Sequence, residues 1–232
     1  MLHANELPLR HLFSKLDGKT SGPHCFTGPI GKLLRNCEMK TIQKSYPIEV
    51  PPIIIVKKDL STDQKYLLEI YGAASIGRVS EGFGKRSPRT LNHSRWLTTA
   101  NRILRLYVST NHPEEKLMTL VNFVMKVYVP MWFEIKAKPY ADSGARYIFK
   151  ALVKQQSKEV KEIVLPGMQR NAYFAHHENI LLPMLADENE TIRKLAWRRL
   201  KKCRQKKSSK KVRQFRIPKL NFDSKDYHDI IS

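Results

Sequence analysis

The sequence predicts a mainly α-helical protein with one short extended segment and a basic C-terminal helix and tail. Three observations support this fold class. Apolar residues recur with a helical period over residues 92–110. The strongly apolar run over residues 117–135 has the length and composition of a buried core helix. A run of 14 lysines and arginines without an acid then follows between Thr191 and Phe222.

The positive charge is concentrated in that basic run. The chain has 42 Lys and Arg against 21 Asp and Glu, a net charge of +21. Without the basic run, 28 basic residues face 21 acidic ones, so the rest of the chain is close to ordinary. Such an excess indicates a polyanionic partner. The three cysteines form no Cys-x-x-Cys pair, which favours a reducing compartment over a disulfide framework.

The first 57 residues are rich in glycine and proline, which predicts short helices separated by turns. Residues 46–57 are expected to be extended, because Ile53 to Val56 favour β geometry. Pro51 and Pro52 exclude a central strand. The predicted parts are residues 1–57, a helical domain over 58–188, a basic helix and flexible segment over 189–217, and a tail over 218–232.

Local signals define several helix ends. Ser61 and Gln64 have the spacing of a capping box, ahead of a helix that runs to about Ile76. A polar loop is expected over residues 77–88. Pro113 suits the first turn of the apolar helix, and Pro130 should kink or end it. Further helices are predicted over residues 143–158, 171–186 and 190–207.

The apolar run is predicted to lie in the protein core and not in a membrane. Lys126, Pro130 and Glu134 interrupt it, and a lipid-spanning helix tolerates such groups poorly. A carboxylate among apolar residues must be paired or neutral. Two interpretations of Glu134 stay open: an ion pair with a Lys or Arg, or a catalytic or metal-binding group.

The predicted helix over residues 92–110 carries Arg95, Arg102 and Arg105 away from its apolar face. These arginines form either a solvated face or a basic ridge that contacts phosphates. Trp96 lies beside the apolar stripe. It either stacks on an unpaired base or belongs to the core.

The basic run begins with a helical pattern. Its apolar positions share one face: Ile192, Leu195, Ala196, Leu200 and Cys203. The residues expected outside that face are Arg193, Lys194, Trp197, Arg198, Lys201 and Lys202. The five cations among them are predicted to contact a nucleic-acid backbone. A solvated helix without a dedicated partner is the alternative. Lys206, Lys207, Lys210 and Lys211 resemble a nuclear import signal, which predicts nuclear localisation.

The sequence contains no clear pattern of a catalytic or metal site. The histidines and cysteines near residues 24–37 and 176–178 do not match a zinc spacing. Gly82, Gly84, Lys85 and Ser87 only loosely resemble a phosphate-binding loop. Neither a nucleophile elbow nor a carboxylate pair stands out. We therefore expect no cofactor, no metal and no enzymatic activity.

Several segments resemble a family of transposon-derived proteins of arthropods and other invertebrates. These segments span nearly the whole chain: Leu2–Arg10, Leu16–Gly18, Ser21–Pro23, Gly28–Gly31, Asp59–Tyr66, Asn92–Thr99 and Ile217–Phe222. The related proteins reach this region through a Cys-x-x-His element, to whose histidine His3 corresponds. The resemblance implies that the chain is the C-terminal part of a longer mobile-element protein.

A more distant similarity connects these features to hAT-type transposases, where Arg95 and Trp96 match an Arg-Trp pair whose tryptophan lies near the DNA. That class has an RNase H-like fold with a helical insertion, and three acids that hold two metal ions. The comparison places the first two acids before residue 1, and leaves Glu134 or Glu178 at most as a remnant of the third. The chain departs from the class in the residues after the pair and in the distance from His3 to Trp96.

The sequence thus predicts a DNA-binding remnant of a mobile-element protein without transferase activity of its own. DNA is preferred over RNA as partner, and no membrane is expected. The first predicted contacts are Arg95, Trp96, Arg102 and Arg105, and the second is the basic run. Two alternatives stay open: a helical protein-interaction module whose basic tail directs nuclear import, and a decayed fragment without function.

Overall fold

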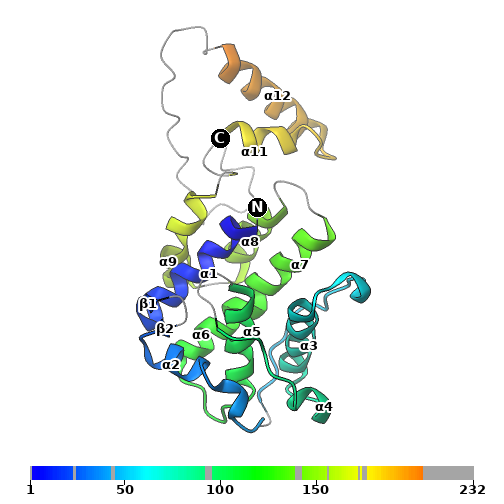
Figure 1. Cartoon of the computed structure of the whole chain (residues 1–232). Helices are drawn as coiled ribbons and strands as arrows, with labels where there is room; N and C mark the ends of the chain where they lie inside the picture. The colour runs from blue at the N-terminus through cyan, green and yellow to red at the C-terminus, as the bar shows by residue number, and fades with distance from the viewer. Residues whose placement is uncertain are drawn as a thin grey trace. The chain divides into compact units, whose positions relative to one another are not determined.

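The computed structural model describes residues 2–22, 25–42, 45–91, 96–138, 143–155, 157–171, 173 and 177–205. The protein is mainly α-helical, as predicted (Figure 1). Its helices are α1 (Leu2–Asp17), α2 (Pro29–Leu34), α3 (Thr62–Ile76), α4 (Glu81–Gly84), α5 (Trp96–Tyr107), α6 (Glu115–Phe123), α7 (Val129–Ala137), α8 (Ser143–Gln155), α9 (Lys158–Gln169), α11 (His177–Met184) and α12 (Glu190–Gln205). Two short strands, β1 (Thr20–Gly22) and β2 (Cys25–Phe26), pair antiparallel with Thr20 opposite Phe26.

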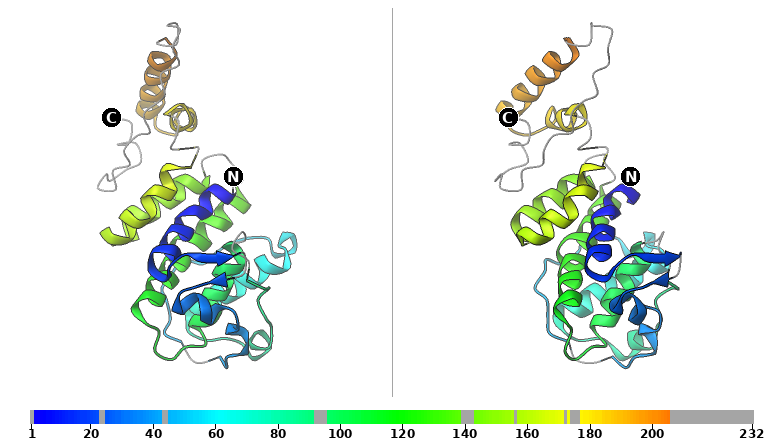
Figure 2. Two further views of the ribbon diagram at one scale, coloured as in Figure 1. Left: turned by 60° about the vertical axis from the view of Figure 1, so that its left-hand side comes forward. Right: turned by 90° about the vertical axis from the view of Figure 1, so that its left-hand side faces the viewer.

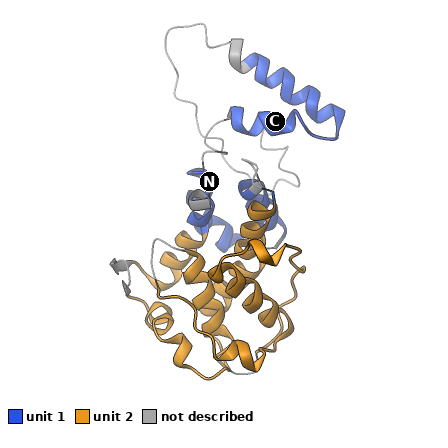
Figure 3. Cartoon of the chain, turned by 45° about the vertical axis from the view of Figure 1, so that its right-hand side comes forward, with its two compact units in different colours: residues 1–8, 138–232 blue, residues 9–137 orange. Residues whose placement is uncertain are grey.

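The chain forms two compact units (Figure 3). One comprises residues 9–137, and the other combines residues 1–8 with residues 138–232. This division differs from the predicted boundaries at residues 57 and 188. The first 57 residues do not form a separate part, because residues 9–57 belong to the unit of residues 9–137, where α2 and the 3-10 turn Cys37–Met39 pack against α5.

Helix α5 is the centre of the unit of residues 9–137. It packs against α2, α3, α6 and the short 3-10 turn Cys37–Met39. All but one of its twelve residues are buried. A helix that neighbours enclose on several sides has no solvated face, whatever the polarity of its sequence.

Helix α3 begins and ends as the local sequence predicts. The Ser61 amide donates to Oε1 of Gln64 at 2.9 Å, which completes the capping box. Gly77 ends the helix with a φ of +70°, a left-handed conformation that favours glycine. The predicted polar loop beyond it contains the short helix α4.

Residues 46–56 are extended, as predicted, and a 3-10 turn follows at Lys57–Asp59. The β propensity of Ile53 to Val56 does not lead to a paired strand among the residues that the structure describes. The Ile48 amide donates instead to the Ala74 carbonyl at 3.1 Å, and the Tyr71 hydroxyl donates to the Pro51 carbonyl at 2.8 Å. The segment is therefore attached to helix α3, which supplies the partners that a neighbouring strand would provide.

The apolar run over residues 117–135 is buried, as predicted. It lies in a continuous helical stretch in which the π-helical segment Val124–Tyr128 joins α6 to α7. Pro130 neither ends nor interrupts this stretch. The π-helical segment immediately before it widens the backbone where the proline ring would otherwise clash with a carbonyl. Pro113 precedes the N-cap Glu114 and lies outside the first helical turn. No helix in the described residues is long and apolar enough to span a membrane.

The sequence predicted short helices in the first 57 residues but not one as long as the 16 residues of α1, and α9 was not predicted. Each has an internal proline, Pro8 in α1 and Pro166 in α9, and proline is a signal against a helix interior. The other predicted helices are present at the expected positions, but their described ranges are shorter than predicted. The helix expected over residues 171–186 is described from His177 to Met184, and that expected over 190–207 is described to Gln205.

Asp17 joins α1 to α2. Its two carboxylate oxygens accept hydrogen bonds from the amides of Ile30 and Gly31, at 2.8 and 2.7 Å. Gly28 and Gly31 permit this approach, because a Cβ at Gly28 would lie 1.7 Å from the Asp17 carbonyl oxygen and one at Gly31 2.2 Å from the Cβ of Phe26. Two of the segments behind the family resemblance therefore form one structural junction.

Candidate nucleic-acid interface

Helices α11 and α12 pack against each other within their unit (Figure 2). Among the α12 side chains that the structure describes, Ala196 and Leu200 are buried, four residues apart on one face. Those of α11 are Ile180, Leu181 and Met184. The apolar period predicted for the first half of the basic run is thus the docking face of α12.

The turn before α12 is held by its own polar groups. Asn189 accepts a hydrogen bond from the Thr191 amide at 2.9 Å. The Arg193 guanidinium donates to the carbonyls of Asp187 and Glu188, both at 2.7 Å. Arg193 was predicted to contact nucleic acid, and in the structure it is half-buried and holds this turn.

The opposite side of α12 carries an exposed row of residues that we call the α12 ridge: Lys194, Trp197, Arg198 and Lys201. Spacings of three, four and seven residues bring these positions onto one side of a helix. Lys202 is also exposed and lies beside the ridge, and Arg199 is exposed on another side of the helix. Lys194, Arg198, Lys201 and Lys202 therefore lie on the surface, where the prediction of a nucleic-acid contact requires them.

Positive charge predominates on this surface. Helix α12 contains seven Lys or Arg and one acid, Glu190. Glu190 pairs with Lys194 at 2.8 Å, and both side chains are about two-thirds exposed. Such a pair is weak in water, so Lys194 can exchange it for a phosphate. Arg198, Arg199, Lys201 and Lys202 form no ion pair with any residue that the structure describes.

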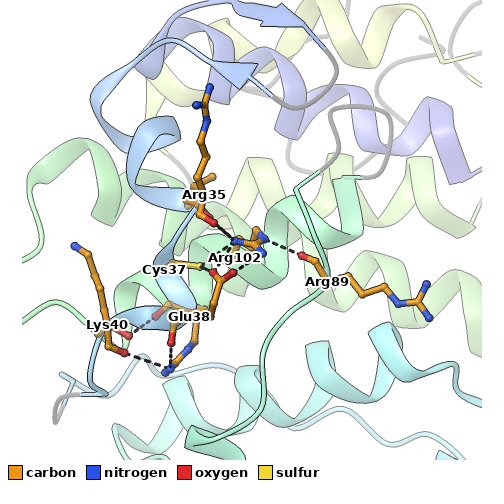
Figure 4. Close-up of polar contacts among 9 residues, drawn as sticks. Arg35, Cys37, Glu38, Lys40, Arg89 and Arg102 are labelled. Carbon is orange, nitrogen blue, oxygen red and sulfur yellow. Dashed lines mark hydrogen bonds and ion pairs between the residues drawn. The ribbon is translucent and has the colours of Figure 1, made fainter.

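The predicted contact of Arg102 with phosphates is wrong. Its side chain is 3% exposed, and its Nη1 and Nη2 donate to the two carboxylate oxygens of Glu38 at 2.8 and 3.2 Å (Figure 4). Backbone carbonyls accept further hydrogen bonds from it: Nη1 lies 2.6 Å from the Leu34 oxygen, and Nε lies 2.7 Å from the Arg89 oxygen. Arg102 thus ties together three segments inside the unit of residues 9–137.

Arg105 is buried as well, at 2% exposure, so it too is removed from the predicted interface. Its Nη2 donates to the carbonyls of Glu38, Lys40 and Gly84, each at 3.3 Å. Its Nε and Nη1 have no hydrogen-bond partner among the described residues. Both helix α5 arginines therefore hold the loop around Glu38 and do not form a basic ridge.

Burial also sets the protonation of groups beside these arginines. Desolvation raises the pKa of the Cys37 thiol to about 11, against the opposing effect of Arg102, so this thiol is neutral at pH 7. Burial alone would raise the pKa of Glu38. Hydrogen bonds from Arg102 and from the backbone outweigh this effect and lower that pKa below its ordinary value of 4.5. Glu38 is therefore ionised and serves as the counter-ion of Arg102.

Trp96 belongs to the core and cannot stack on a base in this fold. It is 2% exposed, and its ring meets Phe13 and Phe26 edge-on at 6.0 and 6.2 Å between ring centres. Of the two predicted roles of Trp96, base stacking or a place in the core, the structure supports the place in the core. Its neighbour Arg95 lies outside the described residues, as do the predicted import-signal residues Lys206, Lys207, Lys210 and Lys211.

Of the two interpretations of Glu134, the ion pair finds no support among the described residues, where no Lys or Arg pairs with it. Glu134 is half-buried on α7, so water still reaches this residue. Glu178 lies half-exposed on α11. Among the residues that the structure describes, no group of three His, Cys, Asp or Glu could hold a metal ion together.

The sequence prediction missed two members of the exposed surface. The helical pattern placed Trp197 outside the apolar face, yet only the cations around it were selected as contacts. Arg199 was not selected at all. An aromatic residue between cations at helical spacing was the available signal for Trp197. Comparisons with protein-family models, curated proteins and solved structures find no match to this chain.

Proposed function

We propose that the protein binds nucleic acid, DNA in preference to RNA, through the α12 ridge and the basic residues beside and after it. One observation carries this proposal: four exposed cations on α12 have no acidic partner among the described residues, on a helix whose other face is docked. Cations in this arrangement keep their positive potential and can replace the counterions of a phosphate backbone. The contact is electrostatic and does not depend on base sequence.

The family resemblance supports a mobile-element origin, and the same proposal assigns no strand-transfer activity to this chain. The RNase H-like fold that the distant similarity implies is built on a central sheet. The described residues contain instead one sheet of two short strands. Purified protein supplied with Mg²⁺ or Mn²⁺ should therefore neither cut nor join DNA, and metal-dependent cleavage that Glu134→Ala abolishes would refute this part.

Salt dependence is the direct test of the proposed binding. Full-length protein is titrated against a labelled duplex at several salt concentrations, and log affinity should fall linearly with log salt, by about 0.9 per contacted phosphate. Replacing Lys194, Arg198 and Lys201 by Gln should reduce that slope by about 2 to 3. Retention on DNA that does not weaken between low and moderate salt would contradict the proposal.

A matched control separates the ridge from net charge. Lys57, Lys58 and Lys65 are exposed lysines in the other unit, and together they border a shallow pocket. Changing these three to Gln removes the same charge as the ridge variant. If both triple variants lose affinity equally, the contact is not localised on α12.

The residues after α12 extend the proposal to the nucleus. Replacing Lys206, Lys207, Lys210 and Lys211 by Gln should abolish nuclear accumulation of a tagged protein, since a basic cluster of this kind is read by the import machinery. The melting temperature should hardly change, because these residues lie beyond the apolar period of α12. Undiminished accumulation would exclude this cluster as the import signal.

A protein-interaction module is a second candidate function, favoured by one observation. Ile54 is 93% exposed and Val56 is 59% exposed, two residues apart on one side of an extended backbone that pairs with no strand among the described residues. An exposed edge of this kind can accept a strand from a partner. A complex with a partner protein that is insensitive to salt and is disrupted by Ile54→Lys would favour this function over electrostatic binding of nucleic acid.

A further inference from the structure

Trp197 is the exposed tryptophan of the chain. All three tryptophans are described: Trp96 is 2% exposed, Trp132 is 4% exposed and Trp197 is 58% exposed. The ring of Trp197 contacts no other aromatic ring and no cation among the described residues. A single exposed apolar residue needs no explanation by itself, so its surroundings decide its meaning.

Those surroundings are cationic along the helix in both directions. Lys194 lies three residues before Trp197 and Lys201 four residues after it, about 5 Å away along the helix axis on either side. Arg198 follows directly. A base that stacks on the indole ring would have its two flanking phosphates near Lys194 and Lys201. An anionic partner with a flat aromatic group between its charges fits this arrangement, and single-stranded nucleic acid has that chemistry.

We infer that Trp197 stacks on an unpaired base, so that the α12 ridge selects single-stranded over duplex nucleic acid. This inference rests on the nucleic-acid binding proposed above and names its substrate class. In a duplex the faces of the bases are covered by their neighbours, and only the backbone cations can act. A single strand exposes those faces, so both the cations and the ring contribute.

The location of the three tryptophans makes binding directly observable. Because the rings of Trp96 and Trp132 lie in the core, quenching of fluorescence by acrylamide should report mainly on Trp197. Addition of an oligothymidine of about 20 nucleotides should quench the emission and protect the ring from acrylamide. A duplex of the same length should cause much smaller changes.

Three variants then separate stacking from charge in the full-length protein. Trp197→Ala should weaken binding of the oligothymidine by about fivefold to a hundredfold and leave duplex binding nearly unchanged. Trp197→Phe should retain part of the preference because it keeps an aromatic face. The ridge variant with Lys194, Arg198 and Lys201 changed to Gln should weaken both ligands. Since Trp197 is exposed, the melting temperatures should match that of the wild type.

Each outcome bears on a specific claim. Equal loss for single strand and duplex in Trp197→Ala, or no loss for either, would overturn the stacking inference while salt-dependent binding keeps the proposed function intact. Salt-insensitive or undetectable binding of both ligands would overturn both. Vesicles of phosphatidylcholine and phosphatidylserine provide the last arm. If the vesicles shift Trp197 emission to the blue and protect the ring from acrylamide more than oligothymidine does, a membrane surface is the partner. That result would overturn the inference.

Discussion

Helices α5 and α12 each carry arginines at helical spacing, and the two helices place them in different environments. In α5, Arg102 and Arg105 are almost completely buried and donate to Glu38 and to the carbonyls of loops. In α12, Arg198 and Arg199 extend into solvent beside lysines. Helix α12 has more cations, seven in 16 residues against two in the 12 residues of α5. The two helices also differ in whether oxygen acceptors from other segments surround the guanidinium groups.

A basic helical face can attract a polyanion only where packing leaves its cations at the surface. The described cations of α12 other than Arg193 are exposed, whereas α5 is enclosed by several neighbours and its two arginines are buried. A charge inside a protein must be paired and hydrogen-bonded, because its desolvation costs several kcal/mol. Arg102 meets this condition through Glu38, so its role is to fix the loop around Cys37 and not to attract a ligand.

The largest expected effect concerns Arg102. Replacing it by Ala leaves Glu38 without its counter-ion and several buried carbonyls without donors, so the free energy of unfolding should fall by about 3 to 5 kcal/mol. Urea denaturation measures this loss. Arg102→Lys should recover only part of it, because an ammonium group cannot reproduce the two-pronged contact with a carboxylate. A stable Arg102→Ala protein that has lost DNA affinity would reverse the assignment of the two helices.

Acid should reveal the same ion pair. The pKa of Glu38 is lower in the folded protein than its ordinary 4.5, so this group stabilises the fold above pH 4.5 and loses that contribution as the pH falls through its folded value. Glu38→Gln should therefore flatten the acid side of the stability profile. The pKa of Asp17 shifts in the opposite direction, because burial raises it despite two backbone hydrogen bonds that lower it. If the free energies of unfolding of the wild type and Glu38→Gln differ by the same amount at every pH, this account is contradicted.

The α12 ridge should show the reverse pattern of effects. Changing Lys194, Arg198 and Lys201 to Gln should alter the free energy of unfolding by no more than about 1 kcal/mol, although it reduces the salt dependence of DNA binding. Thermal melting followed by circular dichroism is the measurement. Unfolding of this variant would show that the ridge is part of the structure, as the α5 arginines are.

The smallest expected effect is that of the exposed ion pair between Lys194 and Glu190. Both groups are about two-thirds exposed, and such pairs one helical turn apart contribute about 0.3 to 0.5 kcal/mol. A double-mutant cycle on the two residues should give a coupling energy of that size, which salt removes. A coupling as large as that expected for Arg102 and Glu38 would mean that exposure does not decide the value of these pairs.

Several parts of the fold were predictable because their signals are local. The capping box of Ser61 and Gln64 uses residues three apart, and the period of α12 repeats within one helix. The exposure of Lys194, Arg198, Lys201 and Lys202 was predictable for the same reason, since the apolar stripe of α12 left them outside it. Arg102 was assigned wrongly because its acceptors lie far away in sequence: the Leu34 carbonyl is 68 residues distant.

The amino-acid sequence by itself determined the helical class, the burial of the apolar run and the concentration of charge in the last part of the chain. Composition and the helical period of apolar residues carry this information, and it does not depend on how the helices are arranged. Only the tertiary structure decided which tryptophan is exposed, which arginines keep their charge at the surface, and that the segment before α3 pairs with a helix. Each of those outcomes depends on contacts between distant segments, and a side chain's own sequence neighbours do not specify them.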